Sequence, residues 1–363
     1  MAVSTIDPNG LNIGQIGGTR NKIINGGMVI DQRNAGAAVT INSGASFTYS
    51  IDRWYGYGQT SDGVFTLQQD TSVPSGQGFT KSLKATVTTA DASIGATQLY
   101  QLGQRIEGYN VADLGLGTAG AASITLSFWV RSSLTGTFGG ALQNGGQNRS
   151  YPFSYTISSA DTWEKKTITL LGDTSGTWLT TNGTGVEVIW GLGIGSTYLG
   201  TAGSWSGSFL AGVTGQTQVI ATNGATFYIT GVQLEAGDVS TPFEHRSYGQ
   251  ELALCQRYFF KTYAQNAAPG TANAGGMVGR YIDGTQSYAS LDCRFPVSMR
   301  AAPTVTLYAP ANGQSGVIQT DGPNYRSAIV ASSGEQGAWA YINNISIAAS
   351  VGTQAHFVAQ SEL

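Results

Sequence analysis

The stretch Ser123-Ile124-Thr125-Leu126-Ser127-Phe128-Trp129-Val130-Arg131-Ser132 alternates apolar and polar side chains along its whole length. Its apolar residues at 124, 126, 128 and 130 fall on one face, and Thr, Ser, Trp and Arg fall on the other. A period of two is typical of a half-buried antiparallel strand. The stretch therefore predicts a strand that packs one face against a core.

Similar short runs continue to the end of the chain. They lie at 166–171, 185–190, 226–234, 275–282, 288–295, 304–308 and 346–349, separated by clusters of Gly, Ser, Thr and Asn. Many short strands joined by such turns are typical of a sandwich or jelly roll. We therefore predict an all-β fold: a jelly-roll β-sandwich, then a short helix, then a second, smaller β-sandwich domain.

Three local signals refine this prediction. The apolar residues of the strand predicted at 226–234 stand at odd-numbered positions in Phe227 and Ile229 but at even-numbered positions in Val232 and Leu234. This one-residue shift predicts a β-bulge at Thr230-Gly231. Between 247 and 260, apolar residues recur at helical spacing behind a capping box formed by Ser247 and Gln250. Asp283-Gly284 between two apolar runs predicts a hairpin.

These signals divide the chain into four parts. Residues 1–20 hold turn formers and little apolar periodicity, which predicts an arm that orders only against a partner. Residues 21–240 form the predicted jelly roll, 241–262 the helical linker, and 263–363 the C-terminal β domain. Each β part has enough residues to enclose its own core.

Composition excludes several classes of function. Of 363 residues, 51 are Gly and only 11% are charged, with 18 basic against 21 acidic side chains. Without a basic block there is little to attract nucleic acid or an anionic membrane. The N-terminus lacks the pattern of a secretory signal, and no apolar run is long enough to span a membrane, so neither export by that route nor membrane insertion is expected.

Several motifs, in order, resemble a family of bacteriophage virion proteins, mostly tail-fibre or other appendage proteins. They are NKIING at 21–26, DQR at 31–33, YSIDRW at 49–54, SFWVR at 127–131, ATFYITGVQLE at 225–235 and TPFEHR at 241–246 leading to LCQRYF at 254–259. These proteins carry a jelly roll similar to carbohydrate-binding modules. The stretch FPVSMRAAPTV at 295–305 is similar to the tip domains that often follow.

The resemblance implies a virion structural protein, assembled in the host cytoplasm, that sits in the tail or another external appendage. The resemblance leaves the ligand open. From the residues themselves we expect that 1–20, with few apolar side chains, bind other virion proteins, and that exposed Tyr and Trp rings recognise host-surface polysaccharide. Two alternatives stay open: a head-decoration fibre, and a free-standing carbohydrate-binding module.

No catalytic residues, metal site or cofactor are expected. The acids are scattered singly, and neither Asp161 with Glu164 nor Asp52 with Asp62 is brought together by any pattern, so a glycosidase pair is not predicted. Many related modules hold a structural calcium. Asp31 could supply one ligand, but Thr230-Gly231 stands where the last strand usually carries aspartate.

A sugar-binding site requires exposed aromatic rings beside amide and hydroxyl groups. The candidate platforms are those set among glycines: Tyr55, Tyr57, Trp178, Tyr198 and Trp205. Trp54 and Trp129 lie in strand-like runs and are expected to support the structure instead.

A homotrimer is also expected. The surface has few of the charged residues that keep monomers apart, and the helix between 247 and 260 has an apolar face. Three such helices around an axis would bury Leu252, Cys255 and Phe259, which are the predicted oligomer interface.

Overall fold

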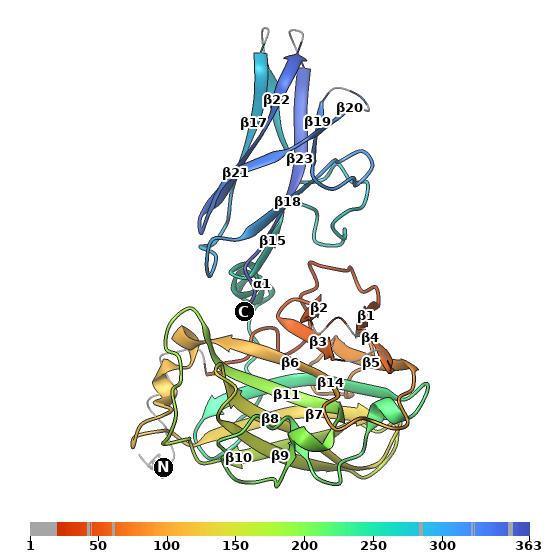
Figure 1. The fold of residues 1–363 in the computed structure, drawn as a ribbon, viewed down its shortest axis with the longest axis vertical. Helices are drawn as coiled ribbons and strands as arrows, with labels where there is room; N and C mark the ends of the chain where they lie inside the picture. The colour runs from red at the N-terminus through yellow and green to blue at the C-terminus, as the bar shows by residue number, and fades with distance from the viewer. Residues whose placement is uncertain are drawn as a thin grey trace, which may run out of the picture.

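The computed structural model describes residues 20–363, apart from 42, 43, 45, 60, 61, 283–285, 321, 323 and 348–350. The chain forms two β-sandwiches joined through a short helix, and the C-terminus returns to the junction between them (Figure 1). The prediction of a jelly-roll sandwich followed by a helix and a smaller sandwich is confirmed. The expected arm and the Asp283-Gly284 hairpin lie outside the described residues, except for Arg20.

Two six-stranded sheets face each other in the larger sandwich, which we call the first module. The order in sheet 1 is β1 (Val39–Ile41), β4 (Val64–Asp70), β5 (Ser82–Thr89), β14 (Thr226–Ala236), β7 (Ile124–Ser132) and β10 (Glu164–Leu170). The order in sheet 2 is β2 (Thr48–Ile51), β3 (Trp54–Gly58), β6 (Leu99–Glu107), β11 (Thr184–Ile194), β8 (Gly136–Asn144) and β9 (Ser150–Ile157). Neighbouring strands far apart in sequence, such as β5 and β14, are typical of a jelly roll.

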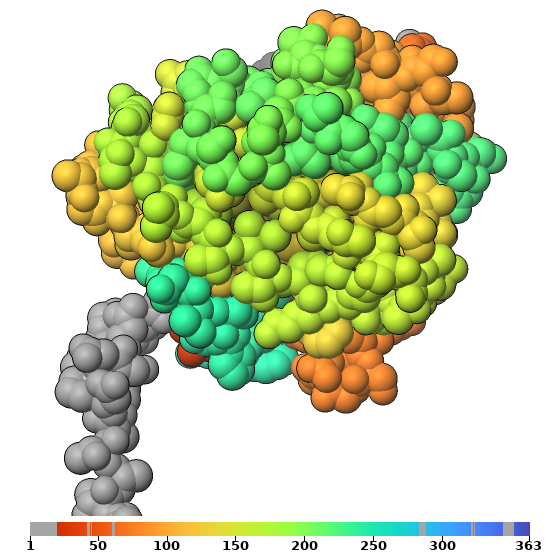
Figure 2. Space-filling view, turned by 90° about the horizontal axis from the view of Figure 1, so that it is seen from below, coloured from red at the N-terminus to blue at the C-terminus, as the bar shows by residue number. Residues whose placement is uncertain are grey.

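Short elements complete this module. Among the described residues, 3-10 helices lie at Gly108–Asn110, Ala112–Leu114, Ser196–Tyr198 and Val219–Ala221. A small parallel pair joins β12 (Leu199–Gly200) to β13 (Gly212–Val213). Seen from the end away from the second module, the first module covers the second completely (Figure 2).

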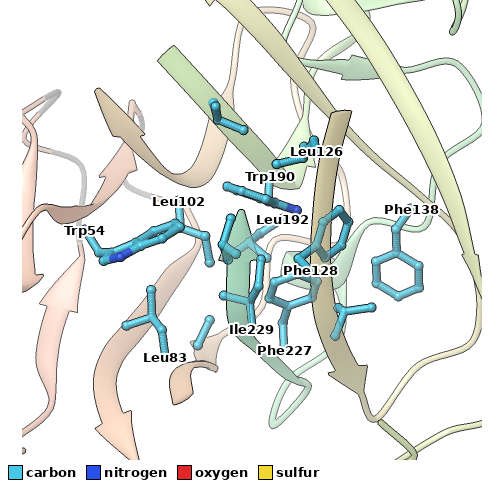
Figure 3. Packing of buried hydrophobic residues seen from close by; sticks show 14 of the residues in the cluster. Trp54, Leu83, Leu102, Leu126, Phe128, Phe138, Trp190, Leu192, Phe227 and Ile229 are labelled. Carbon is cyan, nitrogen blue, oxygen red and sulfur yellow. The ribbon is translucent and has the colours of Figure 1, made fainter. Parts of the chain in front are cut away.

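The core lies between the two sheets and is rich in aromatic rings (Figure 3). Trp190 packs against Trp54 and Phe128, with ring centroids 5.8 and 5.4 Å apart. Full burial of a large apolar side chain contributes about 1.5–3 kcal/mol, so this cluster dominates the stability of the module. Trp129 faces outward from sheet 1 and is only half-buried, so we expect it to contribute less than Trp54 to the stability of the module.

The predicted bulge is present in β14. Thr230 pairs with Trp129 and Gln233 pairs with Ser127, so two residues of β14 oppose one of β7. Gly231 has φ +60°, and a Cβ there would lie 2.5 Å from the ring of Phe79. Glycine is therefore required at the bulge both by its backbone angle and by the space available.

The second module is also a sandwich. Its larger sheet runs β15 (Phe259–Lys261), β23 (Val351–Gln360), β19 (Val317–Thr320) and β20 (Asn324–Ser327), and β16 (Val278–Ile282) and β18 (Thr304–Tyr308) also pair with β23. Its smaller sheet runs β17 (Gln286–Arg294), β22 (Gly337–Ile347) and β21 (Ile329–Gly334).

Between the modules lies α1 (Tyr248–Gln256), which begins with the predicted capping box. The side chain of Ser247 accepts from the backbone N–H of Gln250, and the Gln250 side chain accepts from the backbone N–H of Ser247. The helix is shorter than predicted because Phe259 already belongs to β15.

The predicted oligomer interface is wrong for Cys255 and Phe259, and for Leu252 it stays a prediction. Cys255 is 0% and Phe259 is 4% exposed within the single chain. Cys255 packs with Ile24 and Tyr258, and Leu252 lies against the same cluster. Because the chain itself covers Cys255 and Phe259, these two side chains are not available to hold three copies together, whereas Leu252 is only partly buried. The trimer stays a prediction without an assigned interface.

Arginines fasten the two modules at the junction. Arg33 and Arg53 both form ion pairs with Glu362, and the guanidinium of Arg53 lies 3.6 Å from the ring centroid of Tyr258. Arg257 holds Glu107 through two hydrogen bonds of 2.8 and 2.6 Å. Charge-assisted hydrogen bonds of this kind fix the orientation of the groups that they join, so several oriented contacts hold the junction.

Candidate functional site

A groove of about 430 Å³ opens on the outer face of sheet 2, across β3, β6 and β11. Its position follows from strand register. Residues directly opposite each other in antiparallel strands share a face. Tyr57 is opposite Gln101, and Arg105 is opposite Glu187, so these side chains form two rungs across the outer face. Trp190 and Leu102, at the alternate positions, point into the core.

Aromatic rings gather at one end of the groove. Tyr57, Tyr198 and Phe209 pack around a small apolar cluster containing Leu99 and Ile194. Tyr198 and Phe209 meet edge to face, with ring centroids 5.1 Å apart. Tyr57 is half-buried, and burial raises the pKa of its phenol. The Tyr57 phenol therefore stays neutral near pH 7, and this wall offers its hydroxyl beside aromatic ring faces.

A buried carboxylate organises the floor. Glu187 Oε1 accepts from Tyr55 Oη at 2.5 Å and from Arg105 Nε at 3.1 Å, and its Oε2 accepts from Gln143 Nε2 at 2.7 Å. Burial and the Glu187 carboxylate hold the pKa of Tyr55 well above its usual value. Burial lowers the pKa of Arg105, but Glu187 and neighbouring tyrosines raise it overall. The floor is therefore a charged pair whose charges cancel.

Gly103 makes this network possible. It lies in β6 between Gln101 and Arg105, on the same outer face. A Cβ at this position would lie 2.6 Å from Tyr55 Oη and 2.5 Å from the carbonyl oxygen of Val188. Because real Cβ atoms do not approach so closely, only glycine lets the Tyr55 ring reach Glu187.

Two amide oxygens in this part of the sheet have no partner. Gln101, which lines the groove, and Gln143, which binds Glu187, are both buried. Their Oε1 atoms make no hydrogen bond with any described part of the chain. Buried acceptors are normally satisfied, so a hydroxyl donor that reaches Gln101 from the groove would gain a bond at little cost; Gln143 does not line the groove.

Of the five residues predicted from sequence, two line the groove. Tyr57 and Tyr198 are brought together there. Tyr55 lies on the same face, but its ring is 0% exposed and its hydroxyl is committed to Glu187, so the prediction of an exposed platform is wrong for it.

The two tryptophans lie together at another place. Trp178 is 9% exposed, and its ring centroid is 5.4 Å from that of Trp205. Their indole N–H groups bind the carbonyl oxygens of Ser175 and Leu171. Trp178 is therefore not the exposed ring that was expected, because Trp205 covers it; Trp205 is partly buried. Whether any of the five residues binds a ligand stays a prediction.

Sequence reasoning missed Gln101, Arg105, Glu187 and Phe209. Glu187 was open to detection: it is the one charged residue in the apolar stretch from Val186 to Trp190. A carboxylate in a buried strand needs partners, and that need is a signal for a polar network. Phe209 gave no comparable signal, because its position depends on how a long glycine loop folds back.

The acids elsewhere have other partners. Asp161 pairs with Arg131, and the buried Asp52 accepts hydrogen bonds from Gln32. Asp31 accepts from three backbone N–H groups of its own turn. Among the described residues, no three His, Cys, Asp or Glu side chains gather as metal ligands would. None of the described helices has the length and apolar character that crossing a membrane requires.

No protein-family model and no curated protein matches the sequence. Solved structures do match. The enzymatically active domain of tailspike protein 4 from bacteriophage CBA120 is 13% identical, with a TM-score of 0.31, and covers 60% of this chain. The match spans 21% of that tailspike chain.

Two matches are whole modules. The carbohydrate-binding module TmCBM61, solved with β-1,4-galactotriose, is 11% identical, with a TM-score of 0.29; the match covers 60% of this chain and 100% of the module. The CBM22-1 xylan-binding domain of Paenibacillus barcinonensis Xyn10C is 10% identical, with a TM-score of 0.27, and covers 57% and 99%. At these values the likeness concerns the fold alone.

Proposed function

We propose that the first module binds a polysaccharide in the groove on sheet 2 and does not cut it. One observation carries the proposal: the aromatic side chains of Tyr57, Tyr198 and Phe209 line one groove with the amide of Gln101, whose oxygen has no partner among the described residues. Pyranose rings have an apolar face that stacks on aromatic rings and hydroxyls that donate to amide oxygens. The Arg105–Glu187 pair adds polar atoms without net charge.

The groove offers little for hydrolysis. Glycosidases use two carboxylates that flank the scissile bond, about 5 to 9 Å apart. Glu187 is the single carboxylate among the described residues that line this groove, and three donors already bind it. We expect purified protein to release no reducing ends from a polysaccharide that it binds, and their release would contradict the proposal.

Binding is tested with an array of bacterial and plant polysaccharides, followed by calorimetric titration with the strongest ligand. The double variant Tyr57→Ala, Tyr198→Ala should bind at least about tenfold more weakly, since two stacking faces are lost. Tyr109→Ala is the matched control: this tyrosine is 61% exposed and does not line the groove. Unchanged affinity in the double variant, with normal melting, would refute the groove as the site.

The wider setting is part of the same proposal. The resemblance of the motifs between residues 21 and 259 supports a fibre or appendage protein of a phage virion that recognises a host surface. We propose attachment to other virion proteins through residues 1–20 and assembly as a trimer. A head-decoration fibre and a free-standing module are the alternatives.

Two measurements test this setting. Light scattering at micromolar concentration should give the mass of three chains, and a monomer would contradict the trimer. Deleting residues 2–20 should leave the oligomer folded and prevent its incorporation into particles. Normal incorporation of the shortened chain would contradict the role of the arm, and neither result bears on sugar binding.

A further inference from the structure

A second aromatic face lies on the small sheet of the second module. Trp339 and Tyr341 alternate along β22, so they share the outer face, and Ala338 and Ala340, at the alternate positions, point into the core. Their rings stack, with centroids 5.4 Å apart and planes inclined by 27°. Trp339 is 39% exposed, whereas Tyr341 behind it is half-buried. A supported indole face is therefore presented to solvent.

Polar side chains flank this indole on both sides. Strand register places Asp292 of β17 and Ser332 of β21 directly opposite Trp339. A hollow of about 460 Å³ opens at this rung and is also lined by Arg294 and Glu335. This volume is within the roughly 300–1,000 Å³ of small-molecule sites.

Three charged side chains of the lining are free to bind a ligand. Within the described chain, the carboxylates of Asp292 and Glu335 and the guanidinium of Arg294 take part in no ion pair or hydrogen bond. Charges of both signs line the hollow, so it does not favour a strongly charged ligand. An apolar protein surface fits poorly as well, because it would strip water from these groups without replacing their hydrogen bonds.

We propose that this hollow binds a neutral sugar unit, with the pyranose ring stacked on Trp339 and its hydroxyls bound by Asp292 and Ser332. The site is on a different module from the groove and does not depend on it. Ile329 and Val330, which are exposed on β21, mark the competing possibility that a second copy of the chain covers this face.

Fluorine NMR of the full chain, labelled with 5-fluorotryptophan, tests the proposal. The resonance that disappears in Trp339→Phe is that of Trp339. Titration with β-1,4-galactotriose, xylohexaose and chitotriose should shift it with at least one neutral sugar, and trigalacturonate should have a weaker effect. The shift should persist in the Tyr57→Ala, Tyr198→Ala variant, so failure here and failure of the groove are distinguishable.

Variants set the expected size of the effect. Trp339→Ala should weaken binding at this site by about tenfold or more, and Asp292→Asn by about threefold. Tyr281→Ala is the control, since this tyrosine is 70% exposed on another strand of the same module. The proposal is overturned if no neutral sugar shifts the Trp339 resonance, or if Trp339→Ala instead dissociates an oligomer in light scattering.

Discussion

The groove on sheet 2 and the hollow at Trp339 are both built from polar and aromatic side chains on the outer face of a sheet, but they differ in burial. In the groove, Glu187 is fixed by three donors, and its partners Tyr55 and Gln143 are buried. In the hollow, Asp292 and Trp339 are exposed. The first is organised before any ligand arrives, and the second must be organised by its ligand, which lowers affinity.

Replacing one tryptophan in each module should show the largest contrast. Trp54 is 0% exposed behind sheet 2, so Trp54→Ala should lower the free energy of unfolding by about 3–5 kcal/mol. Trp339→Ala should cost under about 1 kcal/mol, because its ring keeps much of its contact with water. Urea unfolding of both variants measures the difference. Equal losses would show that the second face is as structural as the core.

Removing one carboxylate from each face is the next test. Glu187→Ala leaves Tyr55, Arg105 and Gln143 without their acceptor, and should cost about 3 kcal/mol or more. Asp292→Ala should change stability by less than about 0.5 kcal/mol. If Glu187→Ala melts like the parent protein, the floor of the groove is not preorganised as described.

Alkaline pH should act on the groove through Tyr55. Its pKa is raised in the folded chain, so folding favours the neutral phenol. The resulting stability is present below the ordinary tyrosine pKa of about 10 and is lost as pH rises above it. Thermal melting between pH 8 and pH 11 should therefore fall less in Tyr55→Phe than in the parent. A steeper fall in the variant would contradict the assignment.

Salt should have the smallest effect. The Arg105–Glu187 pair is neutral overall, so affinity for a neutral polysaccharide should change by less than about twofold between 50 and 500 mM NaCl. Calorimetry at both concentrations provides the measurement. A strong loss of affinity at high salt would indicate a charged ligand, and would move the groove away from neutral sugars.

Much of the fold could be predicted from sequence because alternation and turn chemistry are local. The strand at 124–132, the bulge at Gly231 and the capping box at Ser247 each depend on neighbours within a few residues. What covers a surface is not local. Helical spacing showed that Cys255 lies on an apolar face, but Ile24, more than two hundred residues earlier, is what packs against it.

The same distinction between local signals and long-range contacts applies to the candidate site. Tyr57 and Tyr198 were found from their glycine-rich surroundings, and the same reasoning chose Trp178, which Trp205 covers. Arg105 and Glu187 meet only because β6 and β11 pair in one register. No property of either strand alone specifies that register, so the pair could not be derived from the sequence.

The arginine junction also has a mechanical consequence. Arg33 and Arg53 of the first module form ion pairs with Glu362 at the base of the second module. Arg300 donates hydrogen bonds to the carbonyl oxygens of Asn182, Ser361 and Glu362. The two ion pairs to Glu362 and the Arg300–Asn182 hydrogen bond act in parallel between the modules, so a pull on one module would load these three contacts together instead of one at a time.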